Sequence, residues 1–251
     1  MKRTIAGIIL LYGINMSGIT IIGHRGAAGY APENTLSSFA CAIECNVDVI
    51  EFDVWKCASG ELVVFHDSTV DKLTDGHGYV SSKTLNELKQ LTVLGSETIP
   101  TLKEVFDFVN RRVKLFIELK DVDIAHDVLD LIDYYVEYKQ WHYDDFIIGS
   151  FDHVQLKTVK TINSLISVIA LIYGIPVQLA ACAEDIKAQI VGLGVDFINQ
   201  SFVDDIHARG MLVYVYGVNS KENLDRLMSY GVDGIITDYP NHIRTPFFFN
   251  V

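Results

Sequence analysis

The chain has 251 residues, of which 49% are hydrophobic and 21% are charged, and its formal net charge is −12. This balance is typical of a globular chain that buries a large core, and it excludes an intrinsically disordered protein. The negative charge repels polyanions, and no basic stretch carries interleaved aromatic residues, so we expect no nucleic-acid partner. A substrate that carries a phosphate would have to bind to local cations or to a metal ion.

The amino terminus carries Lys2 and Arg3 before an apolar run, Ile5 to Ile14, that has the length of a signal-peptide core. No convincing small-residue cleavage site follows, and the run is too short to span a bilayer. We expect residues 1–18 to be a lead-in segment of a cytoplasmic protein. The alternative is a signal peptide and hence a secreted or periplasmic protein.

From residue 19 onward, short β-branched runs alternate with amphipathic segments, which predicts repeated βα units and a parallel sheet. Helix signals separate the runs, such as Thr35 before Leu36–Cys45, Ser220 before a leucine stripe, and Gly231 at its end. The expected strands are Ile19–Gly23, Val47–Val54, Leu115–Leu119, Phe146–Ser150, Ile166–Leu171, Phe197–Asn199, Leu212–Tyr216 and Gly234–Thr237.

Eight such units fit a single α/β domain over residues 19–251, a closed (β/α)₈ TIM barrel. A doubly wound open sheet is the alternative, but no glycine-rich dinucleotide loop follows the first strand. After the second strand the chain turns and returns through Glu61–His66 as an antiparallel extension. Residues 67–100 then form an insertion, in which Thr84 and Glu87 have the spacing of a capping box that opens a helix through Leu91. We interpret this insertion as a candidate substrate cover.

Acidic residues mark the carboxyl ends of the second and third expected strands. Because side chains alternate along a strand, Glu51 and Asp53 project from the same face, and Glu118 and Lys120 do the same on the next strand. Neighbouring carboxylates on a covered strand are costly unless a cation neutralises them. Three oxygen donors without cysteine suit Mg²⁺ or Ca²⁺ better than zinc. The alternatives are a solvent-facing edge strand and a plain Glu118–Lys120 ion pair.

Two histidines, His24 and His66, follow strands that would converge on one mouth of the barrel. Histidine is the natural proton carrier near neutral pH, although a structural role is the commoner one for a single histidine. Cleavage of a phosphodiester needs a base, an acid and positive charge against the phosphoryl oxygens. Arg25 and Lys120 could supply that charge, and Gly26 would let the backbone pass close to a ligand or simply form a turn.

Taken together, these residues resemble the glycerophosphodiester phosphodiesterase family. The order and spacing of the matching segments, which extend over about residues 19 to 240, argue against a chance match. These segments are Ile22–Gly26, Pro32–Thr35, Glu51–Asp53, Phe65–Asp67, Ile99–Leu102, Glu118–Lys120, Ser150–Asp152, Val218–Asn219 and Ile236–Pro240.

The resemblance implies a barrel with its site residues at the mouth. It implies metal ligands (Glu51, Asp53, Glu118), an acid–base pair (His24, His66) and phosphate ligands (Arg25, Lys120).

Phe151 and Tyr216 occupy positions where the family tends to place aromatic walls around the glycerol or the leaving group. The alternative, which the sequence favours equally, is that both residues are ordinary core aromatics. The chain departs from the family at Tyr216-Gly217, where a Trp-Thr pair is common, which could alter the head-group preference. The tail Phe247–Phe249 could cap the barrel floor or touch a lipid surface, although three aromatics support membrane contact only weakly.

The function that the resemblance implies is hydrolysis of a small glycerophosphodiester to sn-glycerol 3-phosphate and an alcohol, with one divalent cation, Mg²⁺ or Ca²⁺. The sequence leaves open which histidine acts first and whether water or a glycerol hydroxyl attacks. It also leaves open the head group and the oligomeric state. The alternatives are a lysophospholipase D or other phospholipase on the same barrel and, in another class, a non-catalytic binding barrel.

Overall fold

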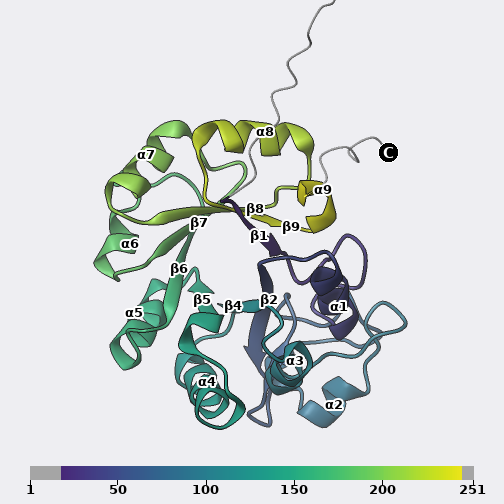
Figure 1. Cartoon of the computed structure of the whole chain (residues 1–251). Helices are drawn as coiled ribbons and strands as arrows, with labels where there is room; N and C mark the ends of the chain where they lie inside the picture. Colours follow the sequence, from purple (N-terminus) through teal and green to yellow (C-terminus); the bar gives the residue numbers. More distant parts are fainter. Residues whose placement is uncertain (1–17, 245–251) are drawn as a thin grey trace, which may run out of the picture.

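The computed structural model describes residues 18–244, and its centre is a closed barrel (Figure 1). Residues 1–17 of the predicted lead-in segment and the tail Phe247–Phe249 lie outside the described residues. The barrel strands are β1 (Thr20–Gly23), β2 (Val49–Lys56), β4 (Lys114–Leu119), β5 (Phe146–Ser150), β6 (Ser167–Ile172), β7 (Ile190–Gly194), β8 (Leu212–Tyr216) and β9 (Gly234–Thr237).

Each barrel strand pairs in parallel with both of its neighbours, and β1 closes the ring by pairing with β2 and β9. Helices surround the ring of strands (Figure 1). They are α1 (Leu36–Glu44), α2 (Leu85–Lys89), α3 (Leu102–Val109), α4 (Ala125–Lys139), α5 (His153–Ile162), α6 (Ala181–Asp185), α7 (Gln200–Ala208), α8 (Lys221–Tyr230) and α9 (Pro240–Arg244). The predicted (β/α)₈ barrel is therefore confirmed. Within residues 18–244, no helix is long and apolar enough to cross a bilayer.

The strands are buried on both faces, and the alternation of their side chains separates two cores. Along β2, Ile50 and Phe52 face the helices and join the large outer core, whereas Val49 joins a small cluster inside the barrel. In the same way, Phe116 of β4 and Tyr214 of β8 point inward. Side chains two or four positions further along these strands keep the same direction, so they lie above this inner layer at the barrel mouth.

One predicted strand is wrong: Phe197–Asn199 is not a strand but the approach to α7, which Asn199 caps by accepting a hydrogen bond from the Phe202 amide. The strand in this unit is β7, whose two glycines weaken the sequence signal. Side chains of the neighbouring strands leave little room for a Cβ atom at either glycine. A Cβ on Gly192 would lie 2.5 Å from a Leu171 methyl, and one on Gly194 would lie 3.2 Å from the Tyr216 ring.

The predicted helix signals are confirmed. Thr35 caps α1, Ser220 caps α8, and Gly231 ends α8 in the left-handed conformation with φ 77°. Thr84 and Glu87 form the capping box of α2, which ends at Lys89, two residues earlier than expected.

The insertion follows a short strand β3 (Leu62–Val64), which pairs with β2 in antiparallel orientation as predicted. It contains a 3₁₀ turn (Val80–Ser82) and α2, and a second 3₁₀ turn (Tyr143–Asp145) precedes β5. The insertion packs around a core of its own that includes Val70, Leu88 and Ile99. Its residues 67 and 68 line a cavity beside the barrel mouth. The substrate-cover role and the domain boundaries drawn from the sequence stay predictions.

Trp141 offers a test of the outer core away from the barrel mouth. It is 2% exposed and stacks on Phe146 with ring centroids 4.9 Å apart. We expect Trp141→Ala to lower the free energy of unfolding by about 3–5 kcal/mol, because the surrounding aromatics cannot fill the cavity. The control Tyr138→Ala, at a side chain that is 62% exposed, should cost less than about 0.5 kcal/mol. Urea denaturation measures both, and equal effects would contradict this account of the core.

Candidate active site

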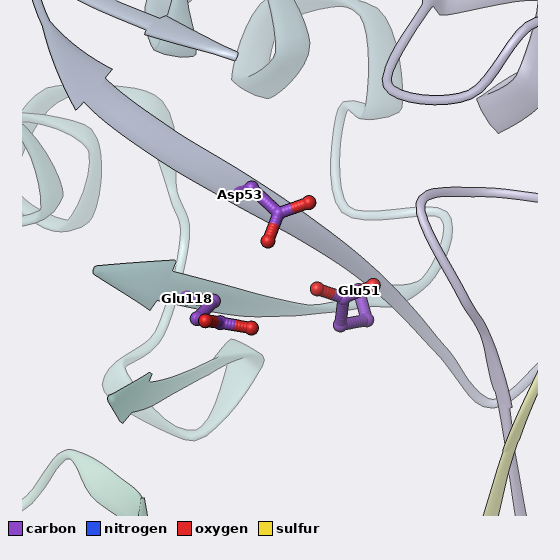
Figure 2. A group of neighbouring side chains, drawn as sticks. All are labelled: Glu51, Asp53 and Glu118. Atoms are coloured by element: carbon purple, nitrogen blue, oxygen red, sulfur yellow. The ribbon is translucent and has the colours of Figure 1, made fainter. Parts of the chain in front are cut away.

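Three predicted carboxylates meet at the barrel mouth. Val49 and Phe116 point into the barrel, so Glu51 and Asp53 on β2 and Glu118 on β4 point inward too. The parallel register places Asp53 directly beside Glu118. One carboxylate oxygen from each of the three residues lies within 4.8 Å of those from the other two. Figure 2 shows the two β2 side chains and the β4 side chain turned toward a common space.

The carboxylates are almost fully buried and are held by hydrogen bonds. Glu51 is 2% exposed and Asp53 is 1% exposed. The backbone amide of Arg25 donates to Glu51 Oε2 at 2.7 Å, and Asn34 Nδ2 donates to Asp53 Oδ2 at 2.9 Å. These bonds fix the two side chains before any ligand arrives.

The backbone around Arg25 is unusual and explains the glycine after it. Arg25 lies in the left-handed region with φ 49°, and Gly26 follows with φ 91°. A Cβ on Gly26 would lie 2.4 Å from Ser38 Oγ. The glycine therefore lets this turn pack against α1, while the turn directs the Arg25 amide toward Glu51.

Both predicted phosphate ligands lie in the site and are paired with its carboxylates. Lys120 Nζ is 2.8 Å from Glu118 Oε1 and 3.5 Å from Asp53 Oδ1. Arg25 forms an ion pair with Glu33 at 2.6 Å, and its Nε, which is 3.6 Å from Asp53, is buried with no hydrogen-bond partner among the described residues. The site thus holds two cations together with its acids.

The pKa shifts indicate that the positive charges of Arg25 and Lys120 do not fully offset the three carboxylates. Burial and then the nearby Asp53 charge raise the pKa of Glu51 to about 8. The same two causes raise the pKa of Glu118 to about 7. Burial also opposes ionisation of Asp53, but Lys120 and Arg25 outweigh it and lower that pKa. Such shifts are expected for a site that is built to hold a further positive charge.

The two predicted histidines lie in the same cavity, each fixed by an aspartate. His24 Nδ1 is 2.6 Å from Asp238 Oδ1, and His66 Nδ1 is 2.6 Å from Asp67 Oδ1. Burial lowers the pKa of His24, but the hydrogen bond to Asp238 and the charge of Glu51 outweigh it and raise the pKa. Burial lowers the pKa of His66, and the opposing charge of Asp53 does not compensate.

A cavity of about 210 Å³ connects these groups. Its polar side is formed by both histidines, Arg25, Lys120 and two of the three carboxylates, and Phe151 and Tyr216 lie on its wall. The rings of these two aromatics meet edge to face, with centroids 6.4 Å apart. All nine residues predicted for the site therefore gather at one mouth, whereas their individual roles stay predictions.

The structure adds residues that were not singled out for the site, namely Asn34, Asp238 and Asn219. Asn219 Nδ2 donates to the second carboxylate oxygen of Asp238, so a chain of polar groups orients His24. All three lie in the segments that carry the family resemblance. Their roles were not visible because the partners are 19 to 214 positions apart in the sequence.

The comparisons with known proteins agree with this geometry. The chain matches the model of the glycerophosphoryl diester phosphodiesterase family over residues 24–242. It is 31% identical over 250 residues to a glycerophosphodiester phosphodiesterase of Bacillus subtilis, with 89% of this chain and 84% of the relative covered. It is 34% identical over 237 residues to one of Caldanaerobacter subterraneus, with 88% and 94% covered.

Solved structures show the same likeness. A phosphodiesterase of Oleispira antarctica, in complex with the product sn-glycerol-3-phosphate, is 29% identical with a TM-score of 0.82, and the match covers 90% of this chain and 95% of that chain. The fold and the site thus define a phosphoric diester hydrolase on a TIM barrel. More narrowly, the chain belongs to the glycerophosphoryl diester phosphodiesterase family.

The raised carboxylate pKa values predict a pH-dependent metal affinity. Without a cation, Glu51 and Glu118 are each partly protonated near pH 7, because their pKa values are about 8 and about 7. A bound cation must displace these protons, so affinity for Mg²⁺ or Ca²⁺ should rise with pH, by up to about tenfold per unit for each proton released, and level off above the higher pKa. Calorimetric titration in two buffers of different ionisation enthalpy measures the release. An affinity that is flat between about pH 6 and pH 8 would contradict the coupling.

Asp238→Asn tests the orientation of His24. The variant loses the carboxylate that favours the charged imidazole, so the pKa of His24 should fall and hydrolytic activity should drop by about 10²- to 10⁴-fold. Titration of the imidazole signals by NMR gives the pKa independently of activity. Asp144→Asn, at an exposed aspartate in the second 3₁₀ turn, is the matched control and should change neither value.

Proposed function

We propose that the protein hydrolyses glycerophosphodiesters to sn-glycerol 3-phosphate and an alcohol, with the help of one divalent cation, Mg²⁺ or Ca²⁺. The observation that carries the proposal is the group of three buried carboxylates, Glu51, Asp53 and Glu118, whose oxygens lie within 4.8 Å of one another. The names of the relatives support the reaction. The Oleispira antarctica structure contains the product sn-glycerol-3-phosphate, which supports the same product for this protein.

The three carboxylates fit a hard divalent cation. All donors are oxygens, and the raised pKa values of two of them mark a deficit of positive charge. When bound there, such a cation would polarise a phosphoryl oxygen and the attacking group. With its ion pair to Lys120, Glu118 would hold the metal next to a fixed ammonium group.

The phosphate would bind between this centre and the two cations of the chain. Arg25 and Lys120 both line the central cavity. Their charges would then stabilise the negative charge that accumulates on the phosphoryl oxygens during the reaction. The Arg25 Nε, which is buried with no hydrogen-bond partner in the part of the chain that the structure describes, would donate to a phosphate oxygen.

The two histidines would move the protons. Both line the central cavity, and in each ring Nδ1 is bonded to an aspartate, which leaves Nε2 for exchange with the substrate. One imidazole would take the proton from the attacking hydroxyl or water, and the other would protonate the leaving alkoxide.

A lysophospholipase D activity on the same barrel is the second candidate. Large hydrophobic side chains of the loop after β6 are exposed: Tyr173 is 76% exposed, Ile175 is 48% exposed and Val177 is fully exposed. Tyr173 also lines the central cavity. An acyl chain attached to the glycerol could lie against this loop.

The test is a comparison of substrates with and without EDTA. The purified protein is incubated with glycerophosphocholine, glycerophosphoethanolamine and lysophosphatidylcholine in the presence of Mg²⁺ or Ca²⁺, and released choline or sn-glycerol 3-phosphate is measured. We expect metal-dependent turnover of the water-soluble diesters. Turnover of the lipid alone would favour the phospholipase, and no turnover of any diester would favour a non-catalytic barrel.

Glu51→Ala tests the metal centre within the same assay. The variant removes one of the three proposed ligands, so metal-dependent turnover should fall by more than about 100-fold, while the fold persists because one of three crowded, buried carboxyl groups is removed. Glu44→Ala, at an exposed glutamate that ends α1, should retain full activity. Normal turnover by a folded Glu51→Ala protein would remove Glu51 from the site.

A further inference from the structure

Tyr216 ends β8 at the barrel mouth, and its hydroxyl oxygen is buried without a hydrogen-bond partner among residues 18–244. A buried hydroxyl without a partner is uncommon, because it loses its hydrogen bonds to water and gains none in the protein. Tyr214 earlier on the same strand faces the barrel interior too, but its hydroxyl reaches Thr20. A ligand at this place could therefore supply the hydrogen bond that the Tyr216 hydroxyl does not form with the described residues.

The barrel makes specific room for this side chain. Gly194 on the neighbouring strand β7 has no Cβ, and a Cβ there would approach the Tyr216 ring to 3.2 Å. The Tyr216 and Phe151 rings also meet edge to face. The position of the ring is therefore fixed by two neighbours, so its hydroxyl is preorganised for one location at the cavity wall.

The cavity that Tyr216 lines also has apolar lining residues, which include Phe116, Leu171 and Ile236. Burial and then the charge of Glu118 raise the pKa of the Tyr216 hydroxyl to about 12, so this group keeps its proton at any working pH. A neutral hydroxyl among hydrocarbon groups suits a ligand with a carbon chain and a hydroxyl group of its own.

We propose that the Tyr216 hydroxyl forms a hydrogen bond with a glycerol hydroxyl of the substrate and thereby selects diesters of glycerol. This inference rests on the proposed function. The phosphate is the weaker candidate for this bond, because Arg25 and Lys120 already serve it as charged donors. The glycerol carbons would lie against Phe151 and Leu171, and the glycerol hydroxyl would otherwise be buried without a partner.

Tyr216→Phe tests the bond because it removes one oxygen atom and keeps the ring. For glycerophosphocholine, we expect kcat/KM to fall by about tenfold, the equivalent of one neutral hydrogen bond made in the complex. For bis(4-nitrophenyl) phosphate, a diester without glycerol, we expect a change of less than about twofold. The variant should melt no lower than the parent protein, because the substitution removes an unsatisfied buried group. Tyr138→Phe, at an exposed tyrosine of α4, should behave like the parent protein on both substrates.

Binding measurements separate this inference from the proposed function. Calorimetry with sn-glycerol 3-phosphate and with methyl phosphate, on metal-loaded protein, should show that Tyr216→Phe weakens the first by about tenfold and leaves the second unchanged. Equal weakening of both ligands, or of neither, would overturn the role of Tyr216 whether or not diesters are turned over. Failure of the parent protein to hydrolyse any glycerophosphodiester would instead overturn the proposed function, and the two binding constants would still decide the role of Tyr216.

Discussion

Three carboxylates held out of water in one small space are the constraint on which the rest of this site depends. Glu51, Asp53 and Glu118 cannot all be ionised in a buried position unless positive charge surrounds them. Arg25 and Lys120 supply part of that charge and keep Asp53 ionised. At the other two carboxyl groups, burial and then the charge of Asp53 outweigh this contribution and raise the pKa values. We propose that these two carboxyl groups exchange their protons for a cation when one binds.

The barrel tolerates this concentration of charge because the side chains that stabilise the fold are different from those that form the site. The outward side chains of each strand pack with the helices in a large apolar core, and the inward side chains form a small apolar floor below the site. The site lies above that floor and uses inward side chains of β2, β4 and β8 together with residues that follow β1, β3, β4 and β5. The imidazoles of His24 and His66 are each fixed by an aspartate, Asp238 or Asp67, so their orientation does not depend on a substrate.

The features that follow from local periodicity could be predicted from the sequence. Alternation along one strand was enough to place Glu51 beside Asp53, and the rhythm of β-branched runs was enough for the barrel. Features that depend on distant partners could not be predicted. Strand β7 was missed because Gly192 and Gly194 look like strand breakers until Leu171 and Tyr216 are seen to fill the space. Asp238 was not recognised as the partner of His24, because the two residues are 214 positions apart.

Anomalous diffraction can locate the cation that we propose among the three carboxylates. Crystals soaked in Mn²⁺ would be measured near the manganese absorption edge, and the anomalous difference map would locate the ion without reference to activity. We expect one strong peak about 2.0–2.6 Å from an oxygen of each of Glu51, Asp53 and Glu118. A map with no peak at the barrel mouth, or with the ion bound to another group of side chains, would contradict the claim.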